Sequence, residues 1–194
     1  IPDSWLRICG IDFGFDHPTA IVWGAINPEN GCFYIVDEYR ESRQTAVEHA
    51  IAIRARPNQP PIAWPHDGNR TFDGGDSMAQ QYRQEGVNFL PEHFTNPPDI
   101  SQTKGDIKIS AGITALTRAM QKGLFKVFQS CHFWQQEYGT YHFGDNGKIV
   151  DKEDDLMSAT RYAFQSQRFA QASESNKKRR PWETEETNNY NWVT

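Results

Sequence analysis

Aspartates stand at three separated places in the chain: inside an apolar run, at the end of a second apolar run, and as a pair at the start of a predicted helix. Asp12 interrupts the apolar run Ile8–Gly24, Asp67 closes a second short apolar run, and Asp154 and Asp155 open a predicted helix. A charge in a buried strand is unfavourable unless something pairs with it. Carboxylates that converge without basic partners repel each other, and Mg²⁺ and Mn²⁺ prefer oxygen ligands. Two such ions, roughly 3.5–4 Å apart, could activate a water and stabilise the leaving oxygen of a phosphodiester.

Each acid also has a simpler structural interpretation. Asp12 could be a turn or strand-edge residue, and Asp67, within the sequence HDGNR, could form an Asx-turn. Asp154 and Asp155 could be ordinary acids of a first helical turn, where the helix dipole favours negative charge. Only the combination of these acids favours a shared site. The strongest contribution comes from Asp12, because an acid inside the first strand has few structural explanations.

The strands that would carry these acids are predicted from short apolar runs with turn residues between them. The first three runs are joined by short links, and tight turns join antiparallel strands, so they form a meander. A fourth run ends at Asp67, with Pro65 tolerable near its end. The predicted strands are 8–13, 20–26, 33–39, 61–67 and 87–91, with a further brief apolar run at 124–128.

Helices are predicted where apolar residues recur at helical spacing. Val47, Ala50, Ile51 and Arg54 share one face of the first, and Ile109, Ile113, Leu116 and Met120 share one face of the third. Asp76 or Ser77 would cap the second, which stops at Gly86. The predicted helices are 44–56, 74–86, 103–123, a short helix and turn within 130–143, and 153–171.

This order of elements predicts an α/β fold with a mixed five-stranded sheet and helices on both faces. In the strand order 3-2-1-4-5, with strand 2 antiparallel, Asp12 and Asp67 lie side by side on parallel neighbours. The last helix could then lean its first turn, with Asp154 and Asp155, over them. We expect one domain over residues 1–172 and a flexible polar tail over 173–194.

The composition narrows the function classes. The chain has 194 residues and a formal net charge of −5, which is not typical of a nucleic-acid-binding domain but suits a site that collects cations. Its three cysteines form no CxxC motif, so we expect reduced thiols. No apolar run predicts a membrane span and no signal peptide is visible. Because the chain begins at Ile1 rather than Met, we expect it to be part of a longer protein.

Four stretches together resemble the nuclease domain of the tailed-phage terminase large subunit. They are GIDFGFDHPTAIVWG, PHDG, TKGDIKISAGITALTRAM and KEDDLMSATRYAF, in that order, and the resemblance runs from about Leu6 to Phe164. The resemblance implies a ribonuclease H-like fold of the retroviral-integrase superfamily, and short-tailed, headful-packaging enterobacterial phages as the nearest relatives. It implies an endonuclease that cuts concatemeric double-stranded DNA at the start and end of headful packaging.

The resemblance also implies roles for individual residues. Asp12, Asp67 and Asp155 would be the catalytic acids and the ligands of two Mg²⁺ or Mn²⁺ ions, with Asp154 as a substitute or helper ligand. Lys104 could contact a DNA phosphate or be a solvated lysine, and Arg161 could reach toward the acids or the DNA backbone or form an ordinary ion pair. Tyr190 and Trp192 could anchor the tail on a partner, which the resemblance implies is the portal protein, or belong to a disordered terminus.

The same resemblance implies where the domain works. Its partners would be double-stranded DNA, the portal protein, the small terminase subunit and the protein's own N-terminal ATPase domain, of which no GxxxxGK[ST] loop is present here. The location would be the bacterial host cytoplasm, with transient docking on the procapsid and no membrane.

Three other classes stay open from the sequence. A sugar-kinase or actin-like ATPase lobe also opens on a Gly-Ile-Asp-x-Gly strand, but it needs a phosphate loop and a second lobe. A non-catalytic docking module would lack one of the acids. A Holliday-junction resolvase or transposase would share the fold and prefer branched DNA. His17 and His66 are interpreted as bystanders, and Asp16 as a turn residue.

Overall fold

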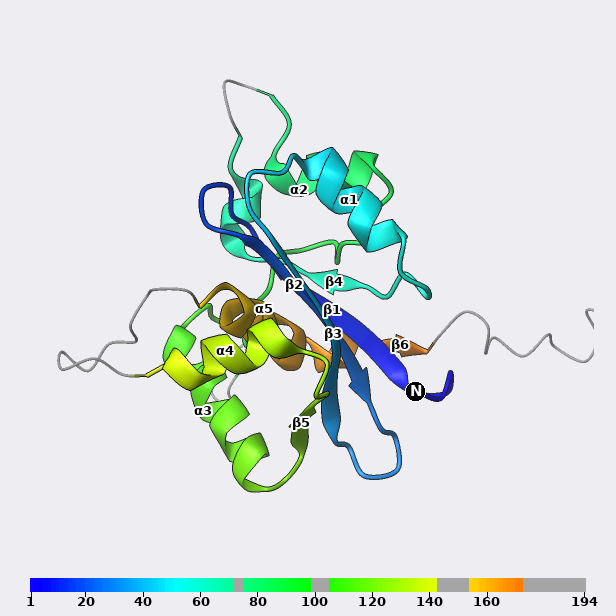
Figure 1. Ribbon diagram of the computed structural model, residues 1–194, viewed down its shortest axis with the longest axis vertical. Helices are drawn as coiled ribbons and strands as arrows, with labels where there is room; N and C mark the ends of the chain where they lie inside the picture. Colours follow the sequence, from blue (N-terminus) through cyan, green and yellow to red (C-terminus); the bar gives the residue numbers. More distant parts are fainter. Residues whose placement is uncertain (72–74, 99–104, 143–153, 173–194) are drawn as a thin grey trace, which may run out of the picture.

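Three long antiparallel strands form the centre of the sheet in the computed structural model, which describes residues 1–71, 75–98, 105–142 and 154–172. They are β1 (Leu6–Asp12), β2 (Thr19–Ile26) and β3 (Phe33–Glu41). β2 pairs with β3 over its whole length, with one irregularity between Trp23 and Gly24, and with β1 from Ala20 to Ile26. The predicted meander is confirmed (Figure 1).

Shorter strands extend both edges of this meander. β4 (Ile62–Ala63) lies parallel to β1, β6 (Gln171–Ala172) pairs antiparallel with β1, and β5 (Phe125–Val127) lies parallel to β3. The order is β4-β1-β2-β3-β5, so the mixed sheet and its predicted order 3-2-1-4 are confirmed. The described sheet therefore has six strands rather than five.

The fifth predicted strand, 87–91, is reduced to a single contact. Phe89 forms one parallel bridge with Ile62, on the side of β4 where the strand was expected. The fourth is also shorter than 61–67, because the chain turns after Trp64 into the 3₁₀ turn η1 (His66–Asn69), with Pro65 at its N-cap. The brief apolar run 124–128 instead supplies β5 at the opposite edge.

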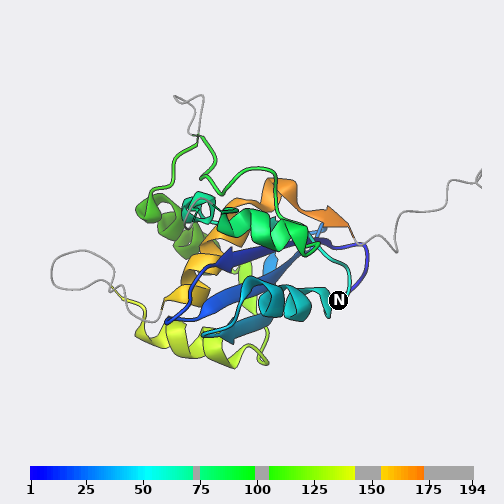
Figure 2. The same cartoon turned by 90° about the horizontal axis from the view of Figure 1, so that it is seen from above.

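Helices cover both faces of the sheet, as predicted (Figures 1 and 2). α1 (Ala46–Arg54) and α2 (Met78–Gln84) pack on one face, in a core that includes Ile11, Ile21 and Trp64. α3 (Ile109–Gln121), α4 (His132–Thr140) and α5 (Asp155–Gln165) cover the other. Successive strand residues enter opposite cores because side chains alternate across a strand.

The predicted apolar face of α1 is wrong, although the helix exists. Val47 and Ile51 are about half exposed, whereas His49, Ala50 and Ile53 are buried. Nδ1 of His49 lies 3.0 Å from the Tyr39 hydroxyl, so a polar residue turns toward the sheet and rotates the buried face away from Val47. In α2 the predicted Ser77 cap is confirmed, since its side chain accepts from the Gln80 N–H.

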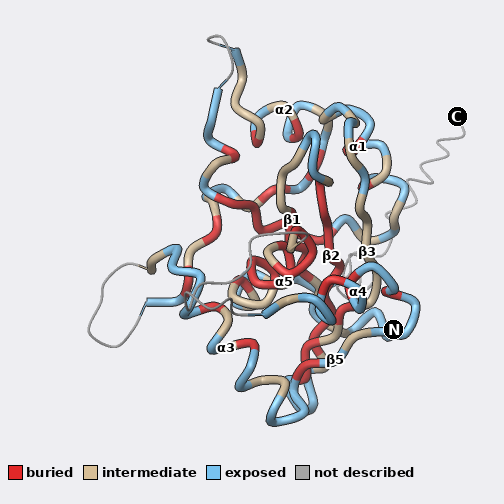
Figure 3. Tube along the Cα trace, turned by 60° about the vertical axis from the view of Figure 1, so that its left-hand side comes forward, coloured by how far each residue is buried: buried red, intermediate tan, exposed pale blue. Residues whose placement is uncertain are grey.

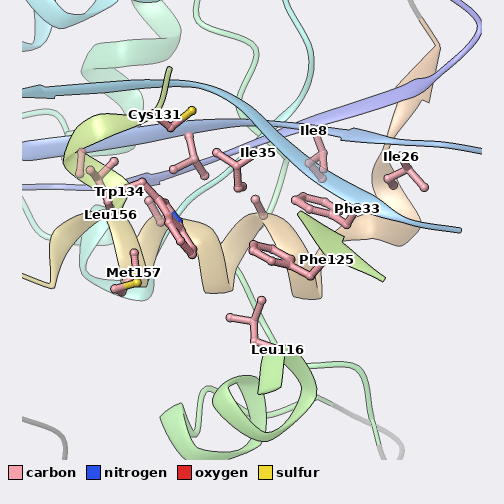
Figure 4. Packing of buried hydrophobic residues seen from close by; sticks show 14 residues of the cluster. Ile8, Ile26, Phe33, Ile35, Leu116, Phe125, Cys131, Trp134, Leu156 and Met157 are labelled. Atoms are coloured by element: carbon pink, nitrogen blue, oxygen red, sulfur yellow. The ribbon is translucent and has the colours of Figure 1, made fainter. Parts of the chain in front are cut away.

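α5 packs directly against β1. A Cβ on Gly10 of β1 would collide with the Ala159 carbonyl, so only glycine lets the helix backbone approach this far. Figure 4 shows Leu156 and Met157 packed with the apolar side chains under β2 and β3, and Figure 3 shows buried residues concentrated along β1, β2 and α5. α5 ends at Gln165, short of the predicted 171, and a 3₁₀ turn over Gln167–Phe169 follows. None of the helices in the described ranges has the length and apolar character that a membrane crossing requires.

Candidate metal and active site

Asp12 stands at the end of β1, where the strand leaves the core. Its side chain is half-buried, and burial raises its pKa well above the ordinary value. The charges of Asp67, Asp155 and Asp154 raise it further, in that order, whereas Arg161 lowers it. The structure therefore brings together the four acids that the sequence singled out, and Asp12 feels the charge of the other three.

Asp67 reaches this place because β4 runs parallel to β1. The register Cys9↔Ile62 and Gly10↔Ala63 brings both strands to an end at the same edge, and η1 then carries Asp67 just beyond β4. Its Oδ1 is buried and accepts no hydrogen bond from the described part of the chain. A buried carboxylate oxygen without a donor, among other acids, is the arrangement that a cation would satisfy.

Asp155 is the first residue of α5, and its carboxylate lies between two basic side chains. His17 Nδ1 is 3.2 Å from Oδ1, and Arg40 Nη2 is 3.8 Å from Oδ2. Burial raises the pKa of Asp155, while His17 and Arg40 lower it. Asp154, at the N-cap position, is half-buried, and its side chain makes no capping hydrogen bond.

A cavity of about 670 Å³ is lined by three of these acids, Asp12, Asp154 and Asp155, together with His17 and Arg161. Asp67 is not among its lining residues. Among the described residues, no three His, Cys, Asp or Glu side chains are already closed into a metal-binding arrangement. Mutual repulsion opposes such closure until a cation offsets the charges. The donor set, all oxygens from three elements, suits Mg²⁺ or Mn²⁺.

Arg161 lies six residues along α5 from Asp155 and is buried. Its guanidinium carbon is 4.6 Å from the Tyr162 ring centroid and 5.5 Å from that of Phe94. Its charge lowers the pKa of Asp12, and its side chain lines the same cavity as that acid. Burial raises the pKa of the neighbouring Tyr162, and the charge of Asp12 raises it further, whereas the charge of Arg161 lowers it.

The terminase RNaseH-like domain is the family whose model matches this chain, over residues 9–167. The chain belongs to this family. It is 36% identical to the terminase large subunit of Salmonella phage P22 over 170 residues, which make up 87% of this chain and 33% of that protein. The corresponding subunit of Enterobacteria phage LP7 is 36% identical over 164 residues, 84% and 33% of the two chains. The chain thus spans about a third of the length of these relatives.

Solved structures agree with this assignment of the terminase domain. A structure of the P22 large terminase nuclease domain matches with a TM-score of 0.79 at 36% identity, over 89% of this chain and 86% of that one. The nuclease domain of the large terminase of bacteriophage SPP1, solved with bound Mn, matches with a TM-score of 0.56 at 17% identity, over 84% and 86%. At that identity the likeness shows the fold alone, and the predicted ribonuclease H-like α/β fold is confirmed.

Sequence reasoning missed three side chains of the terminase domain's site. The interpretation of His17 as a bystander is wrong, since it contacts Asp155. Arg40 is placed by the sheet register, in which Asp12, Ala20 and Arg40 stand opposite one another across β1, β2 and β3. Arg40 lies one residue beyond the predicted strand 33–39, so the predicted meander did not include it in that row. Glu137, described below, had no sequence signal.

The other candidate residues have different outcomes. Asp16 lies 3.7 Å from Arg43 at the surface, in keeping with a turn role, and the His66 ring stacks edge-on against His93 at 4.9 Å. Lys104, Tyr190, Trp192 and the predicted tail lie outside the described residues. The ligand roles of the four acids and the DNA role of Arg161 stay predictions.

Proposed function

We propose that this terminase domain is a metal-dependent endonuclease that hydrolyses phosphodiester bonds of double-stranded DNA. The gathering of three carboxylates, Asp67, Asp154 and Asp155, around Asp12 of β1, with a buried Asp67 oxygen that accepts no hydrogen bond from the described residues, is the observation that supports it most. Its P22 relative, described as the nuclease domain of a large terminase, has the same fold at 36% identity.

In this proposal Asp12, Asp67 and Asp155 hold the ions, and Asp154 is the additional acid. Two bound Mg²⁺ or Mn²⁺ ions would supply the Lewis acidity that activates a water and stabilises the leaving oxygen. The chain contributes the geometry: β1 and η1 present two acids from one side, and the first turn of α5 presents the others. Arg161 lines the same cavity, which supports the proposal that it holds a DNA phosphate.

We propose the wider setting from the resemblance to the terminase family. As part of a terminase large subunit, the domain would cut concatemeric phage DNA at the start and end of headful packaging. An ATPase domain in the same protein, the small terminase subunit and the portal protein would be its partners. The work would take place in the host cytoplasm on the procapsid.

Cleavage of supercoiled plasmid tests the proposal. The 194-residue chain should nick and linearise plasmid in Mg²⁺ or Mn²⁺, and EDTA should stop it. Asp12→Asn should abolish cutting, whereas Asp37→Asn, which changes an aspartate paired with Arg56, should leave it near wild type. Cutting that persists in EDTA or in Asp12→Asn contradicts the proposal. A strong preference for four-way junctions over linear duplex would favour the resolvase alternative.

The C-terminal segment carries a separate part of this proposal. Residues 176–194 contain four basic residues, three acids and the aromatic residues Trp182, Tyr190 and Trp192, the last two near the end. Aromatic residues are enriched at binding hot spots. We expect the segment to dock on the portal. A full-length large subunit without residues 176–194 should keep its nuclease activity and lose co-sedimentation with portal rings. Undiminished portal binding would contradict the docking role.

A further inference from the structure

The first turn of α5 is capped by a side chain from another helix, although α5 begins with two aspartates. Oε2 of Glu137, on α4, accepts hydrogen bonds from the backbone N–H groups of Leu156 at 2.7 Å and Met157 at 3.3 Å. The first N–H groups of a helix lack partners within it and attract carboxylates strongly. Because Glu137 accepts from these two N–H groups, the Asp155 carboxylate is not required to cap them.

Arg40 links this cap to Asp155. Its Nε lies 3.1 Å from Oε1 of Glu137, and its Nη2 lies 3.8 Å from Oδ2 of Asp155. Glu137 and Asp155 are both buried, so the guanidinium is shared between two desolvated carboxylates. The rigid fork of arginine suits this, since its nitrogens reach two acceptors at once. Glu137 thereby keeps Arg40 from closing fully on Asp155.

We propose that Glu137 and Arg40 are positioning residues that hold the Asp155 carboxylate toward the cavity and leave it available to a divalent cation. Neither residue would touch the ion: both act through Asp155, Glu137 by capping α5 and drawing Arg40 away, Arg40 by fixing the carboxylate's orientation. The inference rests on the proposed function. Residues in this outer position typically change metal affinity roughly 10–100-fold when they are mutated.

Mn²⁺ binding, measured by calorimetric titration of the 194-residue chain at pH 8 without DNA, tests the inference independently of cleavage. Glu137→Gln keeps the size of the side chain and an acceptor oxygen but loses the charge that draws Arg40 away. We expect its Mn²⁺ affinity to fall by roughly tenfold or more. The matched control is Asp37→Asn, which breaks the Arg56–Asp37 pair on the same sheet and should stay within about twofold of wild type.

A second substitution separates positioning from a general structural role. If Arg40 closes on Asp155 when Glu137 is neutral, removing the guanidinium should free that carboxylate again. The double variant Glu137→Gln with Arg40→Met should therefore bind Mn²⁺ at least about threefold more tightly than Glu137→Gln alone. Arg40→Lys alone, which keeps the charge but cannot span both carboxylates, should weaken binding several-fold.

The outcomes are distinct. Wild-type affinity in Glu137→Gln, an equal loss in Asp37→Asn, or a further loss in the double variant overturns the inference. If Glu137→Gln fails to melt cooperatively in EDTA, Arg40→Lys decides, and wild-type affinity there overturns it. Wild-type chain that binds no Mn²⁺ removes the proposed function, and this inference with it, whereas wild-type binding with unaffected variants leaves the function in place.

Discussion

Neutralising Glu137 should make the metal-free terminase domain more stable at alkaline pH. Glu137 is buried at 4% exposure, and burial raises its pKa from the ordinary 4.5 to about 7. The Leu156 N–H and Arg40 oppose the rise, but Arg40 Nε lies 3.1 Å from Oε1 without the alignment of a hydrogen bond. The folded state therefore favours the protonated form, which Glu137→Gln imitates.

The magnitude follows from the pKa. Each pKa unit is worth about 1.36 kcal/mol, so the rise to about 7 corresponds to about 3 kcal/mol of unfolding free energy. Because the folded pKa is raised, this stability is present in full below pH 4.5 and is lost as pH rises through 7. At pH 8 Glu137→Gln should exceed wild type by up to about 3 kcal/mol, or roughly 6–12 °C in Tm for a domain of this size.

Urea unfolding in EDTA at pH 4.5 and pH 8 measures the effect. The two proteins should differ by less than about 1 kcal/mol at pH 4.5 and diverge toward pH 8. Arg56→Gln, at the pair on the opposite face, is the control and should show no such divergence. A Glu137→Gln variant that is less stable than wild type at pH 8 would show that the α5 cap and Arg40 stabilise the charged form, and would refute the reasoning.

Three further predictions concern the Asp12 carboxylate, the packing of α5 on β1, and DNA binding. Asp12→Asn should raise Tm in EDTA at pH 8 by at least roughly 2 °C, because an amide relieves the burial and repulsion that raise the Asp12 pKa, and a lower Tm would indicate a structural role. Gly10→Ala should cost about 1–3 kcal/mol in urea unfolding, because its Cβ collides with Ala159, whereas Gly139→Ala, which meets nothing, should cost nothing. The isolated acidic chain should bind duplex DNA no tighter than about 10⁻⁶ M at physiological salt by fluorescence anisotropy, and nanomolar binding would contradict this.

The parts of the fold that rest on local pattern could be predicted from the sequence. Short links between β1, β2 and β3 require antiparallel pairing, and parallel placement of β4 then puts Asp67 beside Asp12. The prediction of a strand at 87–91 is wrong because β4 has only two residues before the chain turns at Pro65. It can therefore form only a single bridge with Phe89. Apolar runs alone do not tell which of two short segments will find a strand edge.

The remaining site residues depend on contacts between distant elements. Arg40 stands in one row with Asp12, but it lies one residue beyond the predicted strand 33–39, and nothing in the sequence marked it as functional. Glu137 is a charged residue in an otherwise ordinary helix, and its role exists only because α4 packs beside the start of α5. The predicted buried face of α1 is wrong for a related reason. His49 is buried because the Tyr39 hydroxyl pairs with it, and the spacing of apolar residues gives no sign of that contact.

Anomalous diffraction from Mn²⁺-soaked crystals of this chain tests the central claim most directly. Two manganese peaks are expected at the end of β1, with Asp12, Asp67 and Asp155 among their ligands and Asp154 beside them. An empty cavity at saturating Mn²⁺, or peaks held by other residues, would contradict it.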